Sequence, residues 1–350
     1  MADRDTATPS PVDPALVDVD RIAAWMDDRG LEAGPLTDLT QLAGGTQNIL
    51  LRFRRGTREF VLRRPPPHKR ANSDETMRRE ARVLGALAGS DVPHPALIAA
   101  EPDESVIGAA FYLMEPVDGY NVTLGLPPAL ADDAAAQREM GLAMADAIAA
   151  LARVDPVERG IADLGRWEGW GERQVPRWRR QLESYRELDG YPGPDIPGVD
   201  EVGAWLEANR PSDLRPGIIH GDFHFANVLI HPTEPRVAAV VDWELATIGD
   251  PLLDLGHLLA CWPTRTGTAL TPVAAAALPD QADVVGRYAA GSDRDLSSVT
   301  WFHVLACYRL GLILEGTHAR ACAGLAPKAT GDMLHAHTLA LFAQASELIS

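Results

Sequence analysis

The sequence has almost no lysine. Only Lys69 and Lys328 occur, and the other 30 of its 32 basic residues are arginine. A basic side chain that pairs with a carboxylate or binds phosphate is therefore expected to be arginine, whose rigid planar fork does not behave like a lysine ammonium group.

Cysteine pairs, long apolar runs and an apolar leader are also missing. Cys261, Cys307 and Cys322 are odd in number and lack CxxC spacing, so neither a disulfide framework nor a structural zinc site is indicated. A reducing cytoplasm fits this pattern best. No run approaches the ~20 apolar residues of a membrane span. The acidic, proline-rich start of the chain is not expected to be a secretory signal.

Basic residues are fewer than acidic ones, 32 against 49. The formal net charge of −17 argues against nucleic acid or an anionic membrane as a partner, because both require a basic face. The acidity would suit a cationic substrate, or would simply keep the protein in solution.

The stretch from Ile218 to Gly256 carries the polar residues that best suit chemistry. Asp222 follows an apolar strand in the run His-Gly-Asp, Asn227 comes five residues later, and Asp242 follows the apolar run from 237 to 241. Such groups at the ends of short buried strands suit phosphoryl transfer, in which the protein mainly positions groups and neutralises charge. Asp222 would accept the proton of the attacking hydroxyl, and Asn227 and Asp242 would hold Mg²⁺, which prefers oxygen ligands.

Each of these residues also has a purely structural interpretation. An Asp after a strand commonly forms a turn or caps a helix, and Asn227 suits an Asx-turn. The ordered set of all three favours the functional interpretation. In a kinase-like pattern, which this set resembles, His220 would support the loop and not take part in chemistry.

The ordered set resembles the aminoglycoside phosphotransferase family, the small-molecule branch of the protein-kinase-like fold. The resemblance is carried by His220-Gly221-Asp222, Asn227, Asp242-Trp243-Glu244, Gly249-Asp250-Pro251 and Asp254-Leu255-Gly256. The interval from Asp222 to Asn227 is that of the kinase catalytic loop, and Asp242 stands where kinases have the Asp of Asp-Phe-Gly.

This resemblance covers about residues 30 to 345 and implies a bilobal α+β fold. A small N-terminal lobe would contain an antiparallel sheet, and a larger C-terminal lobe would be mainly helical. We predict a disordered tail over residues 1–18, a nucleotide-binding lobe over 19–117 and a catalytic and substrate lobe over 118–350.

In the N-terminal lobe, strands are expected over 39–42, 49–53, 58–63, 96–100 and 111–115, and helices over 19–29 and 73–87. Gly44 and Gly45 form either a simple hairpin or the family's loop over the nucleotide phosphates. Glu115 and Val117 lie where the family's backbone contacts the adenine edge.

The third of these strands reads Phe60-Val61-Leu62-Arg63, where kinases have V-A-I-K. Strand alternation puts Val61 and Arg63 on one face, toward adenine and phosphate, and Arg64 on the opposite face in solvent. Glu80, in the following helix, is either one charge on a solvated face or the partner of Arg63. We favour the pair, because Arg63 would otherwise lack a counter-charge.

The C-terminal lobe is expected to contain helices over 129–154, 199–209, 257–262, 281–289, 299–316 and 333–348. The aromatic residues Trp170, Trp178 and Tyr185 either pack a core, which we favour, or line a substrate pocket. His335 and His337 are two residues apart on one helix, which is a poor spacing for shared metal ligation.

One face of the helix over 299–316 is a candidate for part of the acceptor site. Its polar residues are His303, Tyr308, Arg309 and Glu315.

The sequence therefore predicts a phosphotransferase that uses ATP and Mg²⁺ and acts on a hydroxyl of a small molecule. The family's acceptors include aminoglycosides, choline-like alcohols, sugars, homoserine and hydroxyacyl thioesters. The strings from Val61 to Pro66 and from Val241 to Ala246 most resemble the branch fused to acyl-CoA dehydrogenases, which favours a hydroxyacyl or other metabolic alcohol.

Two other functions are weighed against this prediction. A nucleotide-binding protein of the same fold without turnover is the alternative, which Arg63 in place of lysine would allow. A protein kinase is disfavoured, because no A-P-E segment follows Asp242. Neither oligomeric state nor the choice between ATP and GTP is predicted.

Overall fold

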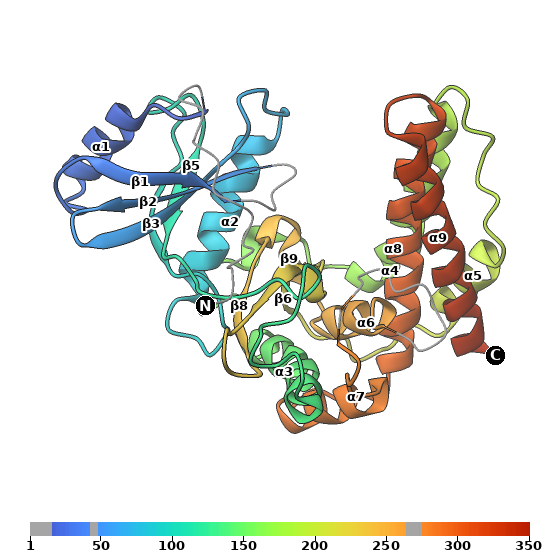
Figure 1. Cartoon of the computed structure of the whole chain (residues 1–350). Coiled ribbons are helices and arrows are strands. Elements are labelled where there is room, and N and C mark those ends of the chain that lie inside the picture. The colour runs from blue at the N-terminus through green and yellow to red at the C-terminus, as the bar shows by residue number, and fades with distance from the viewer. Residues whose placement is uncertain (1–15, 43–47, 264–272, 274) are drawn as a thin grey trace. The chain divides into compact units, whose positions relative to one another are not determined.

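The computed structural model describes residues 16–42, 48–263, 273 and 275–350. Gly44, Gly45 and most of the predicted tail lie outside these residues. The chain divides into a small unit, residues 1–118 with 241–244, and a large unit, residues 119–240 with 245–350. The two units are treated separately below (Figure 1).

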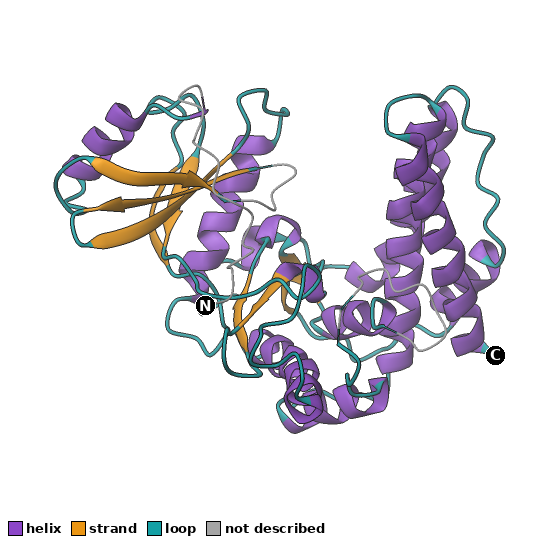
Figure 2. Cartoon of the chain, in the orientation of Figure 1, coloured by secondary structure: helices purple, strands orange, loops and turns teal. Residues whose placement is uncertain are grey.

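The small unit contains a five-stranded antiparallel sheet in the order β1-β2-β3-β5-β4. Its strands are β1 (Leu36–Gln41), β2 (Ile49–Arg55), β3 (Arg58–Arg64), β4 (Leu97–Glu101) and β5 (Phe111–Met114), and its helices are α1 (Val19–Asp28) and α2 (Ser73–Leu87). Figure 2 shows this sheet as the main block of strands in the chain.

Alternation along β3 divides its side chains between the two faces of the sheet. Phe60 and Leu62 join a buried cluster with Ile22, Trp25 and Met26 of α1. Arg63 lies on the opposite face, where it contacts Glu80 of α2. The sheet is thus covered by α1 on one face and by α2 on the other.

The expectation that Arg64 lies in solvent is wrong. Arg64 is only 7% exposed, and its guanidinium donates hydrogen bonds to the carbonyl oxygens of Leu16 and Pro65. The residue does lie on the face opposite Arg63, but the segment that leads into α1 covers that face. The alternation of side chains along the strand correctly predicted which face Arg64 lies on, but it could not predict whether that face is exposed.

The large unit is mainly helical (Figure 2). Its helices are α3 (Ala134–Ala152), α4 (Trp170–Ser184), α5 (Val199–Ala208), α6 (Leu252–Ala260), α7 (Gln281–Ala290), α8 (Val299–Cys322) and α9 (Lys328–Ile349). Four short strands form two antiparallel pairs, β6 (Gly217–Ile219) with β9 (Thr247–Gly249), and β7 (Val228–Ile230) with β8 (Val237–Val240). The α+β class, with an antiparallel sheet in the small unit and a mainly helical large unit, is confirmed.

Helix α3 begins five residues after its predicted start and α9 five residues before its predicted start, and two further boundaries differ for tertiary reasons. Helix α6 begins at Leu252, five residues before its predicted start, because Asp250 accepts a hydrogen bond from the Leu252 amide and caps its first turn. Helix α8 continues six residues past Gly316. A Cβ on Gly316 would lie 2.5 Å from the Tyr185 hydroxyl, so this glycine makes room for a ring and does not end the helix.

The preferred interpretation of the aromatic residues as core is confirmed, since Trp170, Trp178 and Tyr185 are each 8% exposed or less. Within the ranges that the structure describes, no helix is both long enough and apolar enough to cross a membrane.

Candidate active site

The loop that carries Asp222 follows β6 directly and requires a glycine in its turn. Gly221 has φ +83°, a conformation that favours glycine. A Cβ at this position would lie 2.7 Å from the Leu245 carbonyl oxygen. The backbone can therefore make this turn beside the segment after β8 only with glycine at position 221.

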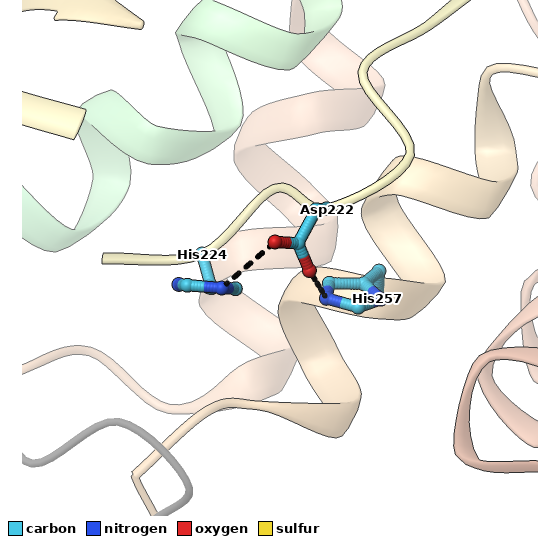
Figure 3. A group of neighbouring side chains, drawn as sticks. All are labelled: Asp222, His224 and His257. Carbon is cyan, nitrogen blue, oxygen red and sulfur yellow. Dashed lines mark ion pairs between the residues drawn. The ribbon is translucent and has the colours of Figure 1, made fainter. Parts of the chain in front are cut away.

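Two histidines flank the Asp222 carboxylate (Figure 3). His257 Nε2 of α6 lies 3.3 Å from Oδ1, and His224 Nε2 lies 3.4 Å from Oδ2. Burial acts to raise the pKa of Asp222, but the contacts with His224 and His257 outweigh it and hold the pKa well below its usual range. Burial lowers the pKa of His257, and the Asp222 carboxylate opposes that shift. Asp222 is thus an ionised carboxylate that two rings hold in place.

Asn227 is tied to the same carboxylate. Its Nδ2 donates to the Asp222 backbone oxygen and to Oδ2, at 2.9 Å each. Because the amide nitrogen faces Asp222, the side-chain oxygen Oδ1 is the atom that Asn227 presents elsewhere. The structure therefore brings Asp222 and Asn227 together, as the spacing predicted.

Asp254 of α6 anchors the loop through its backbone. It is buried, and its two carboxylate oxygens accept from the backbone amides of His220 at 2.7 Å and Gly221 at 2.9 Å. Burial raises the pKa of Asp254 to about 6, and the two amides oppose that rise. The sequence reasoning placed Asp254 in a family motif but gave it no role, and it did not connect His224 or His257 with Asp222.

In the small unit, Arg63 binds two carboxylates. Its Nε lies 2.9 Å from Glu80 Oε2, and one Nη lies 2.7 Å from Asp242 Oδ1. Tyr112 donates a further hydrogen bond of 2.7 Å to Glu80. The predicted pairing of Arg63 with Glu80 is confirmed, and a solvated Glu80 is ruled out by its 1% exposure.

The contact between Arg63 and Asp242 was not predicted. Burial alone would lower the pKa of Arg63, but the carboxylates of Glu80 and Asp242 raise it above its usual value, so the guanidinium stays charged. Asp242 has a positive φ of +65°, which is uncommon outside glycine and often marks a functional residue. Its side chain is 40% exposed, and Arg63 contacts its Oδ1.

The carboxylate oxygens of Glu80, Asp242 and Glu244 lie within 4.8 Å of one another. This group offers only oxygen ligands, which are the ligands that Mg²⁺ prefers. One ligand atom each from Asp222, His224 and His257 also lie within 4.8 Å of one another, but that second group is rich in nitrogen.

The predicted adenine-contact residues lie as follows. Val61 is buried and pairs in register with Met114 of β5. The Glu115 amide donates to the Ala96 carbonyl oxygen, and its carboxylate contacts Arg58. Within the described ranges, the amide of Val117 has no hydrogen-bond partner.

The face of α8 proposed for the acceptor is buried. His303, Tyr308, Arg309 and Glu315 are each 9% exposed or less. The Tyr191 hydroxyl and His335 contact Glu315, so this residue does not face an open acceptor site.

Known proteins match most of the chain. The profile of the phosphotransferase enzyme family, APH, matches residues 38–288. A crystal structure from Ralstonia eutropha JMP134, provisionally described as an aminoglycoside phosphotransferase, is 31% identical with a TM-score of 0.78, covering 95% of this chain and 99% of that one. Aminoglycoside 2′-phosphotransferase-IIIa, solved as a GDP complex, has a TM-score of 0.59 at 14% identity over 94% of this chain and 98–99% of that one, a likeness of fold alone.

The curated relatives are longer proteins. Acyl-CoA dehydrogenase family member 11 from Gallus gallus is 32% identical over 83% of this chain, and the human protein of that name is 30% identical over 84%. In both cases the match spans 38% of the relative. The chain thus corresponds to well under half the length of these relatives.

Proposed function

The chain belongs to the phosphotransferase enzyme family, and from that premise we propose that it transfers the γ-phosphoryl group of ATP to a hydroxyl of a small molecule. The observation that carries the proposal is the ionised Asp222 carboxylate, held by His257, His224 and Asn227 on a loop that Asp254 anchors. A fixed, ionised carboxylate can orient an alcohol and accept its proton as the oxygen attacks phosphorus.

The residues fit Mg²⁺. Asn227 turns its amide nitrogen to Asp222 and so presents Oδ1, and Asp242 has one carboxylate oxygen beyond the one that Arg63 engages. These two residues would hold Mg²⁺, which when bound would neutralise charge on the phosphate oxygens. Arg63, fixed by Glu80, would add a permanent positive charge beside Asp242 in the place of the usual lysine.

The remaining binding roles follow the family pattern. Val61 would contact the adenine, and the Glu115 carbonyl and Val117 amide would bond its edge. The loop with Gly44 and Gly45 would cover the phosphates. Rate enhancement would come from alignment and charge neutralisation, without a covalent enzyme intermediate.

A hydroxyl of an acyl-CoA-related metabolite is the acceptor that we favour. The support is the match to 38% of acyl-CoA dehydrogenase family member 11, a relative whose name places it in acyl-CoA chemistry. A polycationic aminoglycoside is the second candidate, favoured by the likeness to the Ralstonia eutropha protein and by the net charge of −17.

The test is a coupled assay of nucleotide hydrolysis and transfer with Mg²⁺, against hydroxyacyl-CoAs, aminoglycosides, sugars and small alcohols. We expect turnover that one acceptor class stimulates and that Asp222→Ala abolishes, while Asp222→Ala keeps ATP affinity near the wild-type value. ATP binding with no turnover on any acceptor would instead favour a nucleotide-binding protein without transfer. Equal turnover in Asp222→Ala would reject the assigned base.

A further inference from the structure

A second polar cluster lies between α8 and α9, which pack side by side (Figure 1). Glu315 and His318 are one turn apart on α8, and His335 is on α9. One carboxylate oxygen and one nitrogen from each ring lie within 4.8 Å of one another. Among the described residues, no hydrogen bond or ion pair joins this cluster to Asp222.

Glu315 is a buried carboxylate with one oxygen directed to each of two partners. Its side chain has 0% exposure, Oε1 accepts from the Tyr191 hydroxyl at 2.6 Å, and Oε2 lies 2.7 Å from His335 Nδ1. Burial and the neighbouring Glu315 raise the pKa of Tyr191, so its hydroxyl remains a neutral donor. Tyr191 therefore fixes the carboxylate so that Oε2 faces the histidines.

His318 is incompletely satisfied. Its ring stacks on His335 with centroids 4.5 Å apart, and its buried Nδ1 has no hydrogen-bond partner in the described residues. Asp332 Oδ1 is the carboxylate oxygen nearest to that nitrogen, at 3.9 Å, and Cys322 Sγ lies 3.6 Å from Nε2. Buried ring nitrogens normally have partners, so this one requires an explanation.

We propose that Glu315, His318 and His335 bind a divalent transition-metal ion of the zinc class. Two imidazoles and a carboxylate are ligands that Zn²⁺ takes, and a water molecule can complete the tetrahedron. Ligand atoms around a tetrahedral zinc ion are roughly 3.3–3.8 Å apart, so distances up to 4.8 Å close with small side-chain rotations.

The ion would displace the proton between Glu315 Oε2 and His335 Nδ1, while Tyr191 continues to orient the carboxylate through Oε1. A Glu315–His335 contact alone leaves the buried Nδ1 of His318, whose ring stacks on His335, without a hydrogen-bond partner among the described residues. A metal ion accounts for all three groups and would link α8 to α9.

The test is titration of the chelator-stripped protein with Co²⁺, whose visible absorption reports tetrahedral ligation. We expect one equivalent to bind, and His318→Ala and His335→Ala each to weaken binding at least 100-fold. Tyr191→Phe should weaken binding about 10-fold. Zn²⁺ should raise the Tm of the wild type and not that of His318→Ala.

Two histidine variants serve as matched controls. His337→Ala removes a histidine two residues from His335 on the same helix, and His224→Ala removes one from the catalytic-loop group. Both should keep the wild-type Co²⁺ titration. The proposal fails if the wild type binds no Co²⁺, if His318→Ala and His335→Ala bind it normally while folded by circular dichroism, or if His224→Ala abolishes the signal. None of these outcomes depends on phosphotransfer.

Discussion

Asp222 owes its state to side chains from two separate parts of the sequence. His224 and Asn227 come from its own loop, whereas His257 comes from α6. Burial by itself would favour the neutral acid, so the ionised base exists only because these contacts outweigh burial. Removal of one contact should therefore change the pKa of the Asp222 carboxylate.

His257→Leu tests this dependence. Without the Nε2 contact, the pKa of Asp222 rises, and since the base works only when deprotonated, the acid limb of the kcat profile moves to higher pH, by at least about one unit. The measurement is kcat against pH with the best acceptor. His303→Leu is a matched control, because His303 is a buried histidine of α8 whose Nε2 contacts Gln344 and not Asp222. Coincident acid limbs in His257→Leu and wild type would contradict the assignment.

Arg63 allows a double-mutant test. Arg63→Met leaves Glu80 buried without its cation and should cost about 3–5 kcal/mol in urea unfolding. Adding Glu80→Gln removes the stranded charge, so the double variant should be more stable than Arg63→Met alone. If the stability lost in the double variant instead equals the sum of the two single losses, the pair is not coupled.

The stability of Arg63→Lys should fall between that of the wild type and that of Arg63→Met, because one ammonium cannot reproduce the forked contacts with Glu80 and Asp242.

Helix α6 acts as the support of the catalytic loop. Asp254 accepts the His220 and Gly221 amides, and His257 follows one turn later. Gly256 lies between them against the backbone of α8 at Phe302 and His303, where a side chain would not fit. The close packing of two helices thus sets the position of Asp222.

Asp254→Asn should separate support from chemistry. An asparagine has one acceptor oxygen, so one of the two amides loses its partner, at a cost of about 1–3 kcal/mol in unfolding free energy. kcat should fall while ATP affinity stays near the wild-type value. Asp280→Asn is the control, because Asp280 caps α7 through the Asp283 amide and asparagine caps equally well. Unchanged kcat in Asp254→Asn would mean that the loop does not need this anchor.

The elements differ in how far the sequence could predict them. β2, β3 and α2 follow from local alternation and helical periodicity, and Asp222 with Asn227 follows from a spacing within one loop. His257 and Asp254 could not be assigned roles, because their partners are set by the packing of α6 against α8. The predicted solvent exposure of Arg64 was wrong for the same reason, because a strand pattern does not show that the segment before α1 covers this side chain.

At the scale of the whole molecule, the net charge bears on the choice of acceptor. A charge of −17 repels an anionic hydroxyacyl-CoA and attracts a polycationic aminoglycoside, and salt screens both effects. For the acceptor that we favour, KM should therefore fall several-fold as ionic strength rises. For an aminoglycoside it should rise.

The measurement is the acceptor KM across a series of salt concentrations at saturating Mg²⁺-ATP. A small neutral alcohol serves as the reference, because any change in its KM reports salt effects on the enzyme and nucleotide and not on acceptor attraction. A hydroxyacyl-CoA whose KM rises with salt relative to that reference would show that a local positive surface, and not the overall charge, receives the acceptor. Since the basic residues are almost all arginine, substitution of the exposed arginines of the large unit would then locate that surface.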